Sequence, residues 1–167
     1  FSGTGTYHGK GNLPIRMIAP GRVFRSDEVD ATHSPSFHQI EVWSSIKILL
    51  SQILKELFRS LHRNCSDLRQ RQIQTASLPV YRTKCRGRCF LFQCGGKGCR
   101  FCKGSGWIEI LGCGTVHPNV LRMCGIDPDE YTGFAFGVGL ERIALLKYEI
   151  DDMRLLYEND VRFLKQF

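Results

Sequence analysis

Apolar residues recur with helical spacing in the middle of the chain. They stand three and four positions apart, at Ile46, Leu49, Leu50, Ile53, Leu54, Leu57, Phe58 and Leu61. This spacing gathers them on one face of a helix, so the pattern predicts a helix over residues 44–62. Residues 63–93, which come next, show no clean period and predict no regular element.

Other stretches of the chain read as strands and turns. GRVFRS at 21–26 and SFHQIE at 36–41 read as two strands joined by the polar loop DEVDATHSP. WIEILG at 107–112 and the glycine-rich GFAFGVG at 133–139 read as further strands, and LERIALLKYE at 140–149 reads as a helix. With 167 residues, 43% of them hydrophobic, the chain suits a single domain with a core of its own.

Charge is concentrated in one part of the chain. Residues 42–93 hold ten Lys or Arg and two Asp or Glu, a net charge of +8, whereas the rest of the chain has a net charge of −1. The same segment contains only one of the 17 glycines, Gly87. A basic surface patch would explain this composition, and so would a stretch of sequence that does not belong to the fold.

The first pair of strands carries candidate binding chemistry. Phe37, Gln39 and Glu41 alternate along 36–41 and therefore share one face of that strand. An aromatic ring, an amide and a carboxylate on one face can stack a base and hold an ammonium group, and Arg25 can hold a phosphate with its planar fork. An ordinary hairpin with a solvated charged loop would give the same pattern.

The glycine-rich strand that leads into a helix is a second candidate. Small residues let a ligand approach the backbone, and Arg142 in the first helical turn can bind phosphate. A tight turn required only by packing is the alternative.

Taken together, these stretches resemble motifs 2 and 3 of class II aminoacyl-tRNA synthetases. The texts PIRMIAPGRVFRSDEVDATHSPSFHQIE, WIEILGCGTVHPNVL and GFAFGVGLERIALLKYEIDDMRLLYENDVRFLKQF are most similar to the alpha subunits of bacterial phenylalanyl-tRNA synthetases. The resemblance covers residues 11–41 and 94–167. It implies an α+β fold, with a class II antiparallel sheet flanked by helices, as a partial catalytic domain.

The resemblance also implies roles in ATP binding. Arg25 matches the motif 2 arginine, which would bind the α-phosphate, and Arg142 matches the motif 3 arginine, which would bind the γ-phosphate. Phe37 would stack on adenine and His33 would contact the triphosphate. Arg25 and Arg142 are thus the expected catalytic residues. The glycines expected to adjoin ATP are Gly137 and Gly139.

For the amino acid, the resemblance implies that Gln39 and Glu41 hold the amino group of phenylalanine. Ala135 would line the side-chain pocket, where its small size leaves room for the phenyl ring. Glu109 would hold magnesium with ATP, although a surface charge at a strand end is the plainer alternative. The expected cofactors are ATP and Mg²⁺. The chemistry, attack of the amino acid carboxylate on the α-phosphate, needs no covalent nucleophile from the protein.

The expected partners and location follow from the same family. Its alpha subunits act with a beta subunit in an α2β2 assembly on tRNA(Phe), in the cytoplasm. No run of about 18 apolar residues is present, so no membrane span is expected. The opening FSGTGTYHGKG lacks Met and any signal-peptide pattern, and we interpret it as the start of a fragment.

Five of the eight cysteines crowd into the segment 85–106, which we expect to form a Cys- and Gly-rich knuckle. CRFCKGSG at 99–106 has the C-x-x-C-x-G-x-G pattern of zinc-binding J-domain co-chaperones. Cys94, Cys99 and Cys102 are well placed for a structural Zn²⁺, with Cys89 as a possible fourth ligand. Free buried thiols are the alternative, and Cys113 and Cys124 read as core residues.

Residues 42–93 do not resemble the family, although the sequence on both sides does. A natural insertion would explain this, and so would a shifted reading frame. Back-translation of 43–57 and 78–89 into a neighbouring frame gives family-like text, as does the text of residues 1–10. We therefore hypothesise single-base deletions or sequencing errors in the encoding DNA. Glu41 would then end the substrate-binding strand, and the protein would be marginally stable or inactive.

Two further functions stay open from the sequence. The knuckle and the basic segment suggest a zinc-binding interaction module of the J-domain co-chaperone type. A synthetase paralogue that keeps the fold without ligating tRNA is the other alternative.

Overall fold

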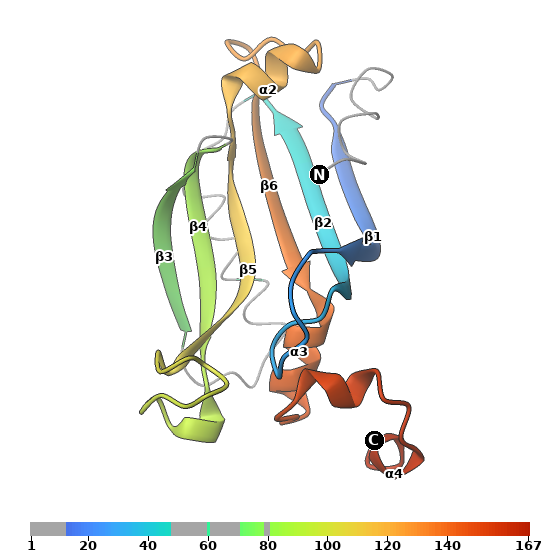
Figure 1. The fold of residues 1–167 in the computed structure, drawn as a ribbon. Helices are drawn as coiled ribbons and strands as arrows, with labels where there is room; N and C mark the ends of the chain where they lie inside the picture. The colour runs from blue at the N-terminus through green and yellow to red at the C-terminus, as the bar shows by residue number, and fades with distance from the viewer. Residues whose placement is uncertain (1–12, 48–59, 61–70, 79–80) are drawn as a thin grey trace.

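The computed structural model describes residues 13–47, 60, 71–78 and 81–167, and its main feature is a six-stranded sheet (Figure 1). The strand order is β1-β2-β6-β5-β4-β3, and every neighbouring pair is antiparallel. The strands are β1 (Arg16–Phe24), β2 (Ser36–Ile46), β3 (Arg71–Leu78), β4 (Tyr81–Phe90), β5 (Trp107–Val116) and β6 (Thr132–Gly139). The expected α+β fold with an antiparallel sheet is confirmed.

Short helices lie at the two ends of the sheet. Figure 1 shows α2 (Pro118–Met123) at one end, and α3 (Leu140–Lys147) and α4 (Val161–Leu164) at the other. The 3-10 turns η1 (Phe92–Cys94) and η2 (Met153–Leu156) complete the described elements. α2 begins at a proline, and the His117 side chain caps it by accepting the Asn119 N–H. No helix in the described part of the chain is long and apolar enough to cross a membrane.

Strand β2 continues five residues beyond Glu41, so the prediction that Glu41 ends this strand is wrong. The predicted helix over 44–62 is also wrong at its start, because Ser44, Ser45 and Ile46 pair with β6. Cross-strand pairing decides the outcome there, since Val42 and Trp43 are good strand residues and Trp43 is buried. Nearly all of the rest of that predicted helix lies outside the described residues.

Strands β3 and β4 lie in the segment for which no regular element was predicted. They pair with each other, and β4 also pairs with β5 along most of its length. The expectation that residues 63–93 form no regular element is therefore wrong for residues 71–78 and 81–90. The sequence does carry a strand signal in β4, where basic residues stand at every second position (Arg82, Lys84, Arg86 and Arg88), whereas β3 shows no clear alternation of apolar and polar residues.

Three clusters of buried apolar side chains hold these elements together. The first joins β5 and β6 to α3 and the knuckle, and includes Leu91, Ile110 and Phe136. The second lies at the α2 end of the sheet, around Trp43 and Leu121. The third packs α3 against the C-terminal turns and includes Leu145, Met153 and Phe163.

Candidate active site

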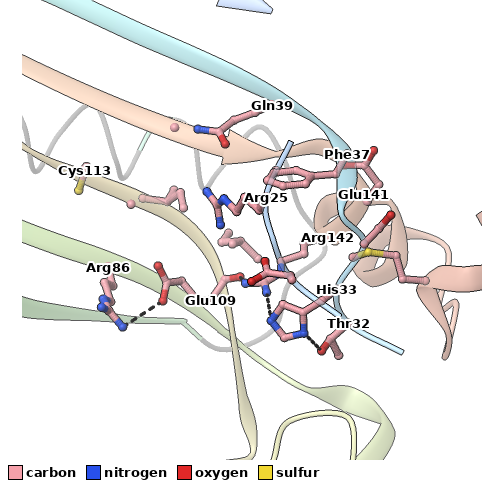
Figure 2. A pocket seen from close by; sticks show the side chains of 18 residues that line it. Arg25, Thr32, His33, Phe37, Gln39, Arg86, Glu109, Cys113, Glu141 and Arg142 are labelled. Carbon is pink, nitrogen blue, oxygen red and sulfur yellow. Dashed lines mark hydrogen bonds and ion pairs between the residues drawn. The ribbon is translucent and has the colours of Figure 1, made fainter. Parts of the chain in front are cut away.

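A cavity of about 390 Å³ lies over the sheet beside the loop that joins β1 to β2 (Figure 2). Most of the residues proposed for nucleotide and amino acid binding line it, although they come from five separate parts of the chain. These are Arg25, His33, Phe37, Gln39, Glu109, Gly137, Gly139 and Arg142. Two proposed residues, Glu41 and Ala135, are not among those that line it.

The floor of the cavity is made of glycines because of how the strands pair. Glu41 of β2 pairs with Gly137 of β6, which pairs with Gly112 of β5, which pairs with Arg86 of β4. Neighbouring strands are about 4.8 Å apart, so the backbones of Glu41 and Arg86 are separated by about 14 Å. The two central residues of this row lack side chains, and the row therefore forms a trough.

Arg25 and Phe37 form one wall of the trough. The Arg25 guanidinium lies over the Phe37 ring, with Cζ 4.8 Å from the ring centroid. The Arg25 backbone N–H donates to the Pro35 carbonyl at 2.9 Å, which closes the loop between the two strands. A cation and an aromatic face are thus presented together, as a nucleotide requires.

Arg142 is held at the end of the trough by two contacts. Its Nη1 donates to the Glu109 carbonyl at 2.8 Å, and its Nη2 lies 3.3 Å from His33 Nε2. His33 Nδ1 in turn lies 2.9 Å from Asp30 Oδ1. An Nδ1–H that donates to Asp30 leaves Nε2 free to accept from Arg142, so this chain of bonds favours one neutral tautomer of His33.

Charges of both signs surround Arg142: the carboxylates of Glu109, Asp30 and Asp27, and the guanidinium of Arg25. Burial lowers the pKa of Arg142, Glu109 opposes this effect, and the positive charge of Arg25 adds to it. Arginine nevertheless keeps its proton in proteins. Burial alone would raise the pKa of Asp30, but hydrogen bonds from the Thr32 N–H, His33 and the Thr32 hydroxyl bring it well below its usual range. Asp30 therefore stays ionised, and it holds the loop near the cationic side chains of Arg142 and Lys103.

Gln39 and Glu41 act as a pair at the β2 side of the trough. Gln39 Nε2 donates to Glu41 Oε1 at 3.0 Å. The Gln39 amide lies over Gly137, where an added Cβ would stand 2.3 Å from Nε2. Gly137 therefore makes room for the amide, and its role in this structure is spatial.

A β-bulge turns Glu109 into the cavity. Leu111 pairs with Gly87, but the next residue of β4, Arg88, pairs with Glu109, so β5 holds one extra residue at this point. Glu109 and Gly112 both line the cavity although they stand three positions apart, because the bulge shifts the alternation. Arg86 Nη1 lies 3.4 Å from Glu109 Oε2 across the mouth of the cavity.

Ala135 lies one step further along the same sheet face. It is buried and belongs to the core cluster that contains Trp43, its cross-strand partner. The space beside Ala135 thus adjoins an indole side chain of the segment beyond Glu41, rather than the described cavity.

Sequence reasoning missed a buried carboxylate, Glu141, a residue that is 7% exposed. Its Oε1 accepts from the His38 N–H at 2.8 Å and from the Tyr157 hydroxyl at 2.8 Å, and lies 2.9 Å from His38 Nδ1. Burial, and then the hydrogen bond to Glu141, raise the pKa of Tyr157, so its phenol stays a donor. An acidic residue in a first helical turn is commonly solvated, and its sequence position gave no signal of burial. Sequence reasoning also assigned no role to Arg86, which lines the cavity.

Three cysteines of the knuckle meet in one cluster. Cys102 Sγ lies 3.9 Å from Cys94 Sγ and 3.7 Å from Cys99 Sγ, and it accepts the N–H groups of Cys99 and Gly106. Burial alone would raise the pKa of Cys102, but those two N–H bonds and the neighbouring thiols lower it to about 7. Cys89, the proposed fourth ligand, is fully buried in the adjoining core and is not one of these three.

The chain is similar to a known family of proteins. A family model described as "tRNA synthetases class II core domain (F)" matches residues 5–167. The phenylalanine–tRNA ligase alpha subunit of Lachnoclostridium phytofermentans is 63% identical over 166 residues, covering 95% of this chain and 47% of that protein. The corresponding subunit of Clostridium beijerinckii is 51% identical over 162 residues, covering 92% and 46%. The chain thus spans about half the length of these relatives.

Solved structures agree on the fold. Two structures of pyrrolysyl-tRNA synthetase from Desulfitobacterium hafniense superpose with TM-scores of 0.61 and 0.63, each at 16% sequence identity. They cover 89% and 90% of this chain, and 47% and 48% of their own. The matches favour a synthetase core over a J-domain type of module.

Proposed function

The chain belongs to the family of tRNA synthetase class II core domains (F), and on that premise we propose that its cavity activates phenylalanine with ATP. One observation carries the proposal: Arg25, His33, Phe37 and Arg142 line one cavity, although Arg142 is 109 residues from His33 in sequence. A base-stacking ring and two guanidiniums are the groups that ATP requires.

In this proposal, adenine stacks on Phe37, and the phosphates lie toward Arg25 and Arg142. Arg25 now covers the Phe37 ring, so it moves onto the α-phosphate when the base enters. Arg142 is already held by the Glu109 carbonyl and His33, and it meets the far end of the triphosphate with little reorganisation.

The amino acid lies further along β2, toward Gln39 and Glu41. Glu41 attracts the ammonium group, and Gln39, held by Glu41, adds a polar contact. The phenylalanine carboxylate attacks the α-phosphorus, the bond from that phosphorus to the bridging oxygen breaks, and pyrophosphate leaves. The carboxylate is already ionised, so the step needs no protein base, and Arg25 neutralises the charge that builds up.

From the family, Mg²⁺ is expected to bind together with ATP, and Glu109 is the carboxylate expected to hold it. In this chain Glu109 does not fit a metal ion well, because its Oε2 already faces the Arg86 guanidinium. Mg²⁺ is bound by one or two carboxylates together with substrate phosphates and waters, and a cation beside the carboxylate opposes it. No step of the reaction is therefore assigned to a metal at Glu109.

We also propose a structural zinc ion at Cys94, Cys99 and Cys102. A tetrahedral zinc site with Zn–S bonds of about 2.3 Å separates its sulfurs by about 3.8 Å. The distances from Cys102 Sγ to Cys99 Sγ and Cys94 Sγ, 3.7 and 3.9 Å, match that value. The N–H groups aimed at Cys102 Sγ, and its lowered pKa, favour the thiolate that zinc requires.

The activity of a whole ligase extends beyond this cavity. By analogy with the relatives, the proposed partners are a beta subunit in an α2β2 assembly and tRNA(Phe), which accepts the activated amino acid. The cytoplasm, where translation takes place, is the proposed location. The paralogue alternative shares the cavity, and it differs only in lacking transfer to tRNA.

Calorimetric titration of the chain with ATP tests the proposal. Arg25→Ala and Arg142→Ala are each expected to weaken binding at least about tenfold, since each removes a charge-assisted contact to phosphate. Arg122→Ala, on the exposed surface of α2, is the matched control and should bind ATP normally. Equal ATP affinity in all four proteins would contradict the proposed site.

A further inference from the structure

The cavity contains a third guanidinium, which sequence reasoning did not assign. Arg86 lies on β4, and its backbone pairs with Gly112 in the row that continues through Gly137 to Glu41. It lines the cavity on the side opposite Gln39 and faces Glu109 in Figure 2. The described cavity thus holds three arginines, with Arg25 and Arg142 at its other wall.

Arg86 is incompletely satisfied by its ion pair. Its Nη1 lies 3.4 Å from Glu109 Oε2, which is long for a charge-assisted hydrogen bond. Its Nε is shielded from solvent and has no hydrogen-bond partner among the described residues. Buried donors without an acceptor are costly and uncommon, so this N–H would be stabilised by an acceptor that reaches it.

The position of Arg86 also matters for electrostatics. The carboxylate of Glu109 is the group that would hold a divalent cation with ATP, but its outer oxygen faces a permanent positive charge. The side chains of Arg86 and Glu109 are 38% and 32% exposed, so water screens their charges only partly. A dication placed at this carboxylate would be repelled by Arg86.

We propose that Arg86 takes the place of the divalent cation at Glu109, so that the cavity binds a nucleoside triphosphate without bound metal. Three guanidiniums then surround the phosphates, and the planar fork of arginine suits phosphate oxygens. This inference rests on the proposed nucleotide site, and it concerns whether the triphosphate binds free or as its Mg²⁺ complex. When the Arg86 side chain turns toward the phosphates, its unpartnered Nε also gains an acceptor from a phosphate oxygen.

The test is calorimetric titration of the full chain with ATP and with inorganic tripolyphosphate, in excess EDTA and in excess MgCl₂. The unmodified chain is expected to bind ATP at least as tightly in EDTA as in MgCl₂. Arg86→Ala is expected to lose about tenfold or more in EDTA, the size of one charge-assisted contact, and to bind more tightly once MgCl₂ is added. Tripolyphosphate should follow ATP, since the inference concerns the phosphates.

Arg88→Ala is the matched control, because it removes the same charge two residues away on β4 and Arg88 does not line the described cavity. Its metal dependence should equal that of the unmodified chain. Glu109→Gln is a second variant, and its expected effect on ATP affinity is opposite to that of Arg86→Ala. It releases Arg86 and should raise ATP affinity in EDTA, whereas a loss of affinity confined to MgCl₂ would show that Glu109 holds the cation and overturn the inference.

A direct metal measurement distinguishes ATP binding without a metal ion from ATP binding with one. Electron paramagnetic resonance of Mn²⁺ should show no more manganese bound to the protein–ATP mixture than to ATP alone. ATP binding that requires Mg²⁺ in the unmodified chain, or that is unaffected in Arg86→Ala, would overturn the role of Arg86 and leave the nucleotide site standing. No ATP binding under either condition would overturn both.

Discussion

Gly137 acts on the candidate site through the space it leaves. The Gln39 amide passes over it to reach Glu41, so the absence of a Cβ at one position sets the conformation of a side chain on the neighbouring strand. Arg86 and Glu109 likewise meet because their strands carry a bulge at this level. Chemistry at this scale depends on register as much as on residue type.

Gly137→Ala is predicted to weaken phenylalanine binding about tenfold. The new Cβ would lie 2.3 Å from Gln39 Nε2, and the flexible amide must turn away from Glu41. Since only the end of a side chain moves, the free energy of unfolding should change by less than about 1 kcal/mol. Calorimetry with phenylalanine and urea unfolding measure the two effects.

Gly139→Ala is the matched control on the same strand, because a Cβ there meets no atom within 4 Å. Equal phenylalanine affinity in the two variants would contradict the role assigned to the Gln39 amide.

Among the elements, β2 and β4 differ most from expectation. The helical spacing that begins at Ile46 lies on a segment whose first residues pair with β6. A strand that pairs on both sides, as β2 does with β1 and β6, satisfies its backbone groups and buries Trp43, and this outweighs a local helical pattern.

Trp43→Ala is predicted to lower the free energy of unfolding by about 3–5 kcal/mol, the usual cost of removing a large buried aromatic ring. Trp43 is 4% exposed and belongs to the core cluster at the α2 end. Ile18→Ala, at a position 69% exposed on β1, should change it by less than about 0.5 kcal/mol. Similar losses in both variants, measured by urea unfolding, would show that residues beyond Glu41 do not form this core.

The knuckle is an element whose stability should depend on metal. Gly98 and Gly106 allow its turns to touch, since a Cβ at either would stand 2.5 or 2.4 Å from a backbone oxygen. We predict that the purified chain binds a single zinc ion and that Cys99→Ala weakens zinc binding at least about a hundredfold, because a thiolate ligand is lost. Elemental analysis and competition with a chelator measure this.

Cys124→Ala is the control for the zinc prediction. Burial raises the pKa of Cys124, which keeps it a thiol, and it packs against the core at the α2 end. Zinc content that is unchanged in Cys99→Ala would contradict the site.

At the scale of the whole molecule, the chain spans about half the length of the relatives it matches. The hypothesis of a shifted frame in residues 42–93 stays a prediction. Sequencing the gene across codons 41–94 tests it directly, and an intact mass that matches the written chain would rule out a recording error.

We predict that the chain alone exchanges pyrophosphate into ATP, with phenylalanine present, far more slowly than full-length relatives do. The wall of the cavity contributed by β4 carries the charged Arg86, and Trp43 adjoins Ala135, where the phenyl ring is proposed to lie. Binding of ATP is expected to survive, because Arg25, Phe37 and Arg142 lie outside residues 42–93. Exchange at rates near those of full-length ligases would contradict this prediction.

The sequence by itself determined the motif strands, the helix after the glycine-rich strand, and the residues proposed to bind the nucleotide. Those features are local: turn residues, alternation and a resemblance that runs through contiguous text. The tertiary structure alone decided where β2 ends, that β3 and β4 join the sheet, and that Arg86, Glu109 and Glu141 meet their partners. Strand pairing, bulges and burial depend on contacts between distant residues, and no local pattern encodes them.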